Sequence, residues 1–385
     1  MEYRTVGVGG DFADWSAAWI WLCTIDPLGD DYEFEQISDC TINNTWPATA
    51  GVPANQIIFN GYSIRFYCPW ENSHQGNPTK GFRTYVNGGN GQLDIVGNTS
   101  VINQDRFYIE NLYIEQTTND NITLLRLYME TGGLGNGLNF YVNNMLIKGF
   151  STVGATGVSC PAHDSIYKVS NCKIWNMRVG FIGTSDGTGG ALPPDNRVEP
   201  NTLENITIYN TSNGTGGIHL RGISSQQRIF EVRNVVSCLN SAGFSWPHAA
   251  GAIFSSVTNW IYNCADDDNS IAIVVAAGFN NASDTVPNIV AANEFASLVD
   301  TETDFLDLIW GLASLNAAGV PVEGKAPLDV RFNADILFSG GAESLGRAGI
   351  APTIQDTDIS GRPIPGYDDA YSIGAQEQAY TNFPE

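Results

Sequence analysis

The sequence predicts an all-β fold in which parallel strands are stacked as a solenoid, and two observations support this. A short phrase built around an asparagine occurs six times between Phe107 and Asn263, and one amphipathic helix near the N-terminus can close the stack. Repeats of roughly 25–35 residues are typical of solenoids, in which each repeat contacts only its neighbours and loops absorb differences in length. The six asparagines are Asn111, Asn144, Asn171, Asn205, Asn234 and Asn259.

Each phrase places apolar residues two before and one after its asparagine, and usually a third one three after. Around Asn171 these residues are Val169, Cys172 and Ile174. Because strand side chains alternate between faces, the residue two before is out of phase with the other two. All three can face one core only if the chain bends at the asparagine, which tolerates left-handed backbone better than other non-glycine residues. We therefore expect one bend per repeat and a ladder of hydrogen-bonded asparagine amides, with a weaker seventh copy at Asn288.

The N-terminal segment predicts a cap for the stack. Residues 4–10, RTVGVGG, are typical of a short strand and a glycine turn, and a helix follows near residues 12–25. Asp11 or Asp14 can cap the start of this helix. Its apolar residues recur at intervals of three and four: Trp15, Ala18, Trp19 and Leu22. The open end of a solenoid presents unpaired strand edges, so a helix here is interpreted as their cover.

The rest of the chain shows strand-like runs interrupted by loops, with no linker that marks a domain boundary. The sequence predicts a protruding loop at 70–91, a strand pair at 92–102 and a long Gly/Pro/Asp-rich loop at 183–201. Residues 304–318 have a partly helical pattern, and residues 325–385 are a mixture of short strands and turns.

Composition and charge limit the classes of function. The 385 residues include 41 acidic and 18 basic ones, which give a net charge of −23. This charge argues against nucleic-acid binding through phosphate neutralisation and makes an anionic polysaccharide an unfavourable ligand without a bridging metal. The N-terminus, MEYRTVGVGG, has no visible secretion signal and no segment is apolar enough to span a membrane, so we expect synthesis in the cytoplasm and no membrane association. The seven cysteines form no CxxC pair, and Cys172 stands at an inward position, so buried free thiols are expected.

Three stretches carry further motifs: TVGVGGDFADWSAAWIWL (Thr5–Leu22), DFLDLIWGLASLNAAGV (Asp304–Val320) and DISGRPIPGYDDAYSIGAQE (Asp358–Glu377). Together with the asparagine ladder they resemble the right-handed parallel β-helix family, the pectate-lyase-like superfamily in its broad sense. The resemblance implies a single-stranded right-handed parallel β-helix of roughly eight to ten coils with an N-terminal capping helix. It divides the chain into the N-terminal strand and cap helix (1–30), the parallel β-helix (31–300) and a C-terminal end and capping region (301–385).

For function, the resemblance is closest to virion structural proteins of tailed phages. It implies a capsid or tail decoration, fibre or spike that self-associates as a homotrimer, contacts other virion proteins and adheres to host-surface glycans. The alternative is a polysaccharide-degrading enzyme, a lyase or a glycoside hydrolase, because the superfamily holds both. A sugar-binding module without turnover is a third hypothesis. A fold alone does not decide among them.

An enzyme of this kind needs paired carboxylates, one protonated as an acid and one ionised. The candidates are Asp266, Asp267 and Asp268, then Asp164 beside His163, and Asp186, Asp195 and Glu199 in the long loop. Acids in such turns are more often simply solvated. The basic residues near the ladder lie in no lyase motif: Arg178, Arg221, Arg228, Arg233, Lys148 and Lys173. His74, His163, His219 and His248 have no zinc-type spacing, and for Trp175 and Trp260 packing is favoured over sugar stacking. The sequence therefore assigns no catalytic, cofactor-binding or metal-binding residue.

Overall fold

The computed structural model of the chain describes residues 1–42, 57–88, 93–98, 105–129, 138–152, 154–160, 166–184, 201–212, 217–221, 230–238, 240, 244–245, 259–262, 279–281, 297–302, 305–306 and 359. Within these residues the fold is mainly β, as predicted. The strand pairings are all parallel and build two sheets. No helix in the described part of the chain is long and apolar enough to cross a membrane.

The larger sheet has 13 strands in the described part of the chain and the smaller has seven. The 13 strands are β1 (Glu2–Val6), β2 (Tyr32–Gln36), β3 (Cys40–Ile42), β5 (Ser63–Tyr67), β6 (Arg83–Val86), β8 (Arg106–Glu110), β9 (Tyr113–Gln116), β11 (Asn139–Lys148), β13 (Ile166–Met177), β15 (Asn201–Thr211), β17 (Phe230–Cys238), β19 (Asn259–Tyr262) and β20 (Phe279–Asn281). The seven are β4 (Ile57–Ile58), β7 (Leu93–Asn98), β10 (Thr123–Met129), β12 (Thr156–Cys160), β14 (Val179–Thr184), β16 (Ile218–Arg221) and β18 (Phe244–Ser245). From β10 to β19 the chain alternates between the two sheets at every step.

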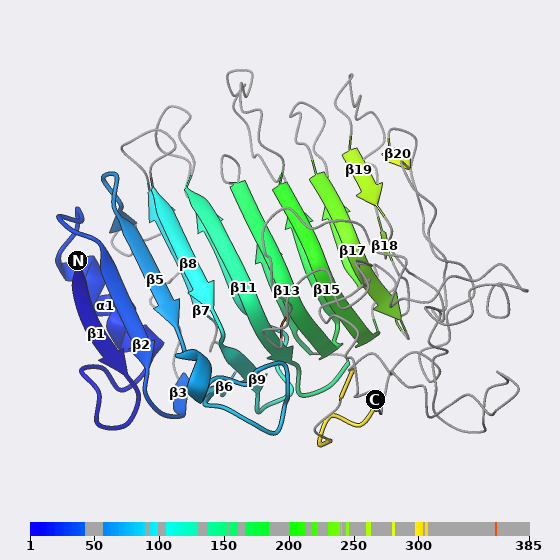
Figure 1. The fold of residues 1–385 in the computed structure, drawn as a ribbon, viewed down its shortest axis with the longest axis horizontal. Helices are drawn as coiled ribbons and strands as arrows, with labels where there is room; N and C mark the ends of the chain where they lie inside the picture. The colour runs from blue at the N-terminus through cyan, green and yellow to red at the C-terminus, as the bar shows by residue number, and fades with distance from the viewer. Residues whose placement is uncertain are drawn as a thin grey trace, which may run out of the picture.

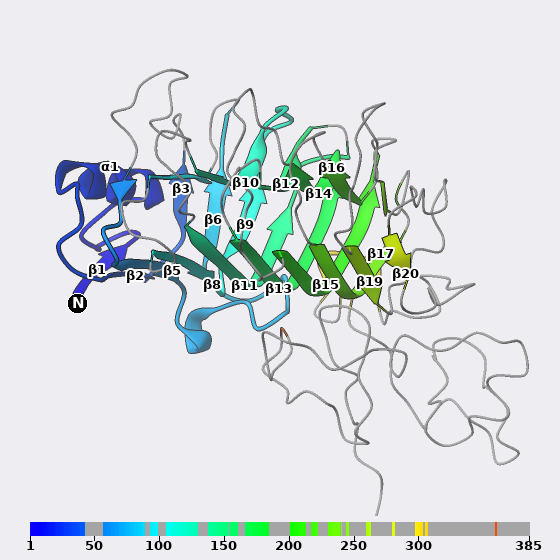
Figure 2. The same ribbon diagram turned by 90° about the horizontal axis from the view of Figure 1, so that it is seen from above.

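The strands of the larger sheet lie side by side along the long axis of the molecule, from β1 at the N-terminal end onward (Figure 1). Seen from above, the strands of the smaller sheet lie on the opposite side of the stack from β2, β5 and β8 (Figure 2). The core therefore lies between the two sheets. The outer face of the larger sheet points away from that core.

The predicted bend at the asparagines is confirmed for four of the six phrases. The backbone φ angle is 61° at Asn111, 54° at Asn144, 52° at Asn171 and 53° at Asn205, all in the left-handed region. The apolar residues on both sides of each bend are buried to within 1 %. In β11, β13 and β15 the bend lies inside one continuous strand, so a single strand lines two walls of the core.

Neighbouring phrases are in register. Val142 pairs with Val169, which pairs with Leu203 in the next strand. Asn144 Nδ2 donates to Asn111 Oδ1 over 3.1 Å, which is one hydrogen bond of the expected kind. The expected amide ladder does not continue from Asn144 to the next repeat, because the buried Asn144 Oδ1 accepts no hydrogen bond. The repeats are therefore aligned residue for residue across β8, β11, β13 and β15.

A second pair of bends, which the sequence phrase did not predict, lies near the ends of β13 and β15. Asn176 and Asn210 have φ angles of 55° and 56°, and Asn210 Nδ2 donates to Asn176 Oδ1 over 2.7 Å. These two residues repeat the same combination of left-handed backbone and stacked amides five positions further along each strand. The chain therefore bends at both ends of the segment from Asn171 to Asn176 in β13 and of the corresponding segment in β15.

The prediction was wrong for the sixth phrase. Strand β19 pairs with β17 so that Val232 stands opposite Ile261 and Arg233 opposite Tyr262. The phrase would have placed Val257 opposite Val232, so the observed register differs by four residues. At Asn259 the third apolar position is occupied by Tyr262, and the weaker pattern does not hold the strand in the register of its predecessors. The seventh copy at Asn288 lies outside the described residues.

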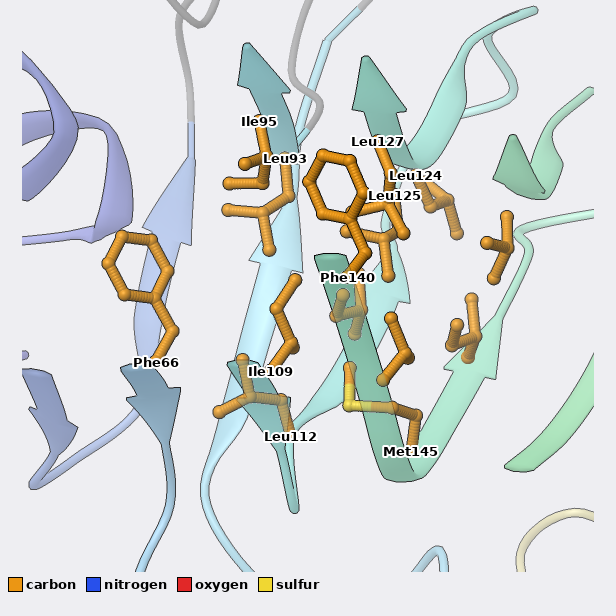
Figure 3. Close-up of a cluster of buried hydrophobic side chains, with 14 of the residues drawn as sticks. Phe66, Leu93, Ile95, Ile109, Leu112, Leu124, Leu125, Leu127, Phe140 and Met145 are labelled. Carbon is orange, nitrogen blue, oxygen red and sulfur yellow. The ribbon is translucent and has the colours of Figure 1, made fainter. Parts of the chain in front are cut away.

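The core is built from aliphatic and aromatic side chains of both sheets. Figure 3 shows Leu93, Ile95, Leu125 and Leu127 of the smaller sheet pointing toward side chains of β8 and β11. These residues have no solvent-exposed surface. At about 1.5–3 kcal/mol for each fully buried large apolar side chain, this stack supplies the main favourable contribution to folding.

The N-terminal cap is confirmed as helix α1 (Trp15–Thr24). Asp14 caps it, because its Oδ1 accepts from the backbone N–H of Ala17 over 2.9 Å. The predicted apolar stripe is fully buried, and Trp15 Nε1 donates to Thr84 Oγ1 over 2.9 Å. Asp11, the other capping candidate, instead accepts from the backbone N–H of Thr5 in β1.

Other predictions were confirmed or corrected in detail. The loop expected at 70–91 contains the short helix η2 (Trp70–Asn72) but ends earlier, because Arg83–Val86 forms β6 between β3 and β9. Of the strand pair expected at 92–102, the described residues contain β7 alone. Cys40, Cys68, Cys160 and Cys172 are buried free thiols, as expected, whereas Cys23 is half-buried. Burial raises the pKa of the Cys172 thiol to about 12.

Replacing Asn144 separates the two roles of the bend residue. Asn144→Ala removes the amide rung and places a β-carbon residue in left-handed backbone, so we expect a loss of about 2–3 kcal/mol in the free energy of unfolding. Asn144→Gly removes the rung but tolerates the backbone, so its loss should be smaller by about 1 kcal/mol. Urea denaturation of both variants measures the difference. An alanine variant as stable as the glycine variant would show that the backbone conformation is not what the asparagine supplies.

Candidate functional site

The carboxylates proposed from the sequence lie outside the described residues. This applies to Asp266, Asp267 and Asp268, to His163 and Asp164, and to Asp186, Asp195 and Glu199. The loops at 183–201 and 264–270 lie outside them as well, except at 183–184 and Asn201. Within the described ranges, no group of three or more His, Cys, Asp or Glu side chains is arranged to hold a metal ion.

Two of the basic candidates, Lys148 and Lys173, make structural contacts. Lys148 pairs with Glu115 over 3.2 Å and with Asp300 over 3.1 Å. Lys173 is fully buried although it points away from the sheet core. Trp175 is also fully buried, its ring 5.0 Å from that of Phe305, which confirms the packing role predicted for it.

Partly exposed polar side chains gather on the outer face of the larger sheet near its N-terminal end. They form two rows, each of which runs across the strands because parallel strands are in register. One row is Glu33, Arg65, Tyr108, Tyr141 and Lys168, and the other is Glu35, Tyr67, Glu110 and Asn143. We call these nine residues, together with Tyr3 beside them on β1, the tyrosine–carboxylate face.

Glu35 is the centre of the first part of this face. Its Oε2 accepts from the hydroxyl of Tyr3 over 2.5 Å and from the hydroxyl of Tyr67 over 3.3 Å. The hydrogen bond to Glu35 raises the pKa of Tyr3. Burial, followed by the charge of Glu35, raises the pKa of Tyr67 to about 12. Both hydroxyls therefore stay protonated and donate.

Arg65 links the two rows. Its Nη2 lies 2.6 Å from Glu110 Oε2, its Nη1 lies 3.5 Å from Glu33 Oε1, and its guanidinium carbon lies 4.4 Å from the centre of the Tyr67 ring. A planar guanidinium suits this position because it can bond carboxylates at its edge and stack on a ring at its face. Arg65 is still 39 % exposed, so it remains accessible to a ligand.

Two tyrosines extend the face toward β13. The rings of Tyr108 and Tyr141 are stacked, with centroids 4.8 Å apart and planes 17° apart, and the Lys168 ammonium lies 5.8 Å from the Tyr141 ring centre. Beyond this point the outward residues Ser170 and Glu204 are completely buried. The open face therefore spans β1 to the start of β13 and ends there.

The groups on this face can bind a polar ligand. Glu33, Glu35 and Glu110 are already engaged by Arg65 or by tyrosine hydroxyls, so the face presents no pair of a free acid and a free base. It does present carboxyl acceptors, a guanidinium donor and aromatic rings in a line. Such groups fix polar ligands by hydrogen bonds while the rings supply apolar contact.

Sequence reasoning missed this face, although a signal for it was present. The run YEFEQ alternates buried residues with outward Glu33 and Glu35, and RFYIE does the same with Tyr108 and Glu110. Alternation identifies outward positions, but it does not reveal that successive strands align them into rows.

Comparisons with known proteins do not assign a family. No protein-family model matches the chain, and no curated protein or solved structure is significantly similar to it.

Asp105 and His74 are buried titratable side chains. Burial raises the pKa of Asp105 and lowers the pKa of His74. Burial raises the pKa of Asp105 from 3.8 to about 6, although its Oδ1 accepts from the backbone N–H of Gly61 over 2.6 Å. Burial, and to a smaller extent the nearby Lys173 ammonium, lowers the pKa of His74 from 6.5 to about 3. The first residue favours folding at low pH, and the second favours it at neutral pH.

Asp105→Asn should reduce the change in folding stability between pH 4 and pH 8. The raised pKa means that the folded state holds the proton more tightly, so this stabilisation is present below about pH 4 and is lost as the pH rises through about 6. We expect the stability of the wild type relative to Asp105→Asn to fall by roughly 1–3 kcal/mol between pH 4 and pH 8. Urea denaturation across this range measures it, and parallel profiles would contradict the assignment.

His74→Gln should have the opposite effect. Because the folded pKa is lowered, the stabilisation is present above pH 6.5 and is lost on acidification toward pH 3. The wild type should therefore lose about 2 kcal/mol more than His74→Gln between pH 8 and pH 5. Denaturant titrations at both pH values test this, with His219→Gln as a matched variant of another buried histidine. A His74→Gln profile that still falls like the wild type would refute it.

Proposed function

We propose that this chain is a structural protein of a virion surface, built as a right-handed parallel β-helix with an N-terminal cap, which adheres to host-surface glycans. The observation that carries the proposal is the tyrosine–carboxylate face, a partly exposed line of tyrosines, carboxylates and Arg65 on a stack of parallel strands. The virion assignment rests on the resemblance of the N-terminal, late and C-terminal motifs to phage virion proteins. The parallel, alternating strand order of the two sheets supports the β-helix.

A rigid stack suits a particle that must survive outside a cell. Parallel strands bonded on both edges leave few open edges, and α1 covers the core at the first repeat. The stack also holds the outward side chains at strand spacing, about 4.8 Å apart. A pre-organised row of this kind binds a regular polymer without the cost of ordering side chains first.

The adhesion half of the proposal predicts a loss of binding on removal of the stacked rings. The double variant Tyr108→Ala, Tyr141→Ala should weaken binding to host-surface polysaccharide at least tenfold, since each ring contributes apolar contact. The control is Tyr85→Ala, a partly exposed tyrosine of β6 in the same sheet. Glycan arrays followed by calorimetry measure the change. Equal binding by the double variant and the control would place any glycan site elsewhere.

The virion half has its own test. Mass spectrometry of purified particles should find the chain, and light scattering of the purified protein should give a trimer, as the resemblance implies. Absence from the particle would overturn the assignment. The enzymatic alternative is decided by incubating the protein with the same glycans. New reducing or unsaturated ends that disappear in an Asp266→Asn, Asp267→Asn, Asp268→Asn variant would replace adhesion by catalysis.

A further inference from the structure

Lys173 occupies an unusual place in the larger sheet. It follows the bend at Asn171 by two residues, so its side chain leaves the sheet on the outer face, yet it is completely buried. Its Nζ donates to the backbone carbonyl of Gly76 over 3.1 Å and to that of Phe305 over 2.9 Å. These two acceptors come from segments on either side of β13 in the sequence, 97 and 132 residues away.

The first segment is the 70–82 loop, which a buried histidine holds against the sheet. His74 Nε2 donates to the backbone carbonyl of Asn144 over 2.8 Å, and its Nδ1 accepts from the backbone N–H of Gly76 over 2.9 Å. The two bonds fix the Nε2–H tautomer of a neutral ring. They also place Gly76 so that its carbonyl faces the Lys173 ammonium.

The second segment comprises residues 297–302 and 305–306, which we call the strap. Its ends are joined by a bridge between Ser297 and Phe305. The Phe305 ring packs 5.0 Å from Trp175, and Asp300 Oδ2 accepts from Trp175 Nε1 over 3.1 Å. Asp300 also pairs with Lys148 over 3.1 Å. The strap is thus fastened to the outer face by one ring, one carboxylate and the carbonyl of Phe305.

We infer that Lys173 couples the 70–82 loop to the strap, so that the order of each depends on the other. An ammonium buried in this way loses hydration and needs carbonyl oxygens to replace it. If the strap detaches, Lys173 loses Phe305 O and becomes exposed to water, which weakens its bond to Gly76 O. Detachment of the loop acts on the strap in the same way. The coupling is reciprocal because it passes through one shared charge.

This coupling is independent of the proposed adhesion, because none of these contacts involves a residue of the tyrosine–carboxylate face. Its consequence concerns the outer face beyond the bends. A partner that displaces the exposed Trp70 side of the loop or the exposed Val299 side of the strap also loosens the other segment. The two segments therefore respond as a unit.

Hydrogen exchange of the full chain, followed by mass spectrometry, tests the coupling. The reporting amides are Asn77, Lys80 and Phe82 in the loop, and Glu302 and Leu306 in the strap, since each donates a backbone hydrogen bond within its segment. In Lys173→Met, exchange in both segments should rise at least tenfold while the core of β13 stays protected. The matched control Lys168→Met, also an outward lysine of β13, should change neither segment.

A second variant keeps the test decisive if Lys173→Met does not fold. Phe305→Ala removes only the ring that fastens the strap, so it should raise strap exchange directly and loop exchange severalfold through Lys173. In a Lys173→Met background that folds, Phe305→Ala should add nothing to loop exchange. Loop exchange that stays at the wild-type level when the strap is loosened would overturn the inference.

Discussion

The whole stack depends on left-handed backbone at one asparagine in each of its central repeats. In a straight strand every second side chain faces the core, so Val142 and Met145, which are three residues apart, would lie on opposite faces. The bend at Asn144 turns both inward, and one strand then lines two walls. It also fixes the register, because a slip by one residue would break the hydrogen bond between Asn144 and Asn111 and would turn the apolar side chains away from the core.

What the sequence predicted well is local. The phrases around Asn111 to Asn205 and the stripe of α1 specify bends, strands and a cap from residues a few positions apart, and the structure confirms them. What it missed depends on distant segments. Nothing near Lys173 distinguishes it from a solvated outward lysine such as Lys168, because its burial follows from Gly76 and Phe305. The register break at Asn259 likewise depends on how β19 meets β17.

The same limit applies to the candidate site. Tyr108 and Trp175 are both outward aromatic residues of the larger sheet, and the alternation of residues along a strand does not distinguish them. Tyr108 is partly exposed, whereas Trp175 is fully buried beneath Phe305 of the strap. Exposure on a regular sheet is therefore decided by which loop returns over it, and a binding face can be identified only after the path of those loops is known.

The bend at Asn144 and the 70–82 loop that packs against it are linked by a hydrogen bond. A residue in left-handed backbone turns its carbonyl away from the regular strand pairing, and a buried carbonyl needs a donor. At Asn144 the donor is Nε2 of His74, which belongs to the 70–82 loop, while the Asn144 side-chain amide donates to Asn111 Oδ1. The docking of the loop thus follows from the geometry of the bend. Weakening the bend at Asn144 should therefore release the 70–82 loop before it disturbs the strands. The strands remain held by their backbone pairing, whereas the loop loses its hydrogen bond to the Asn144 carbonyl.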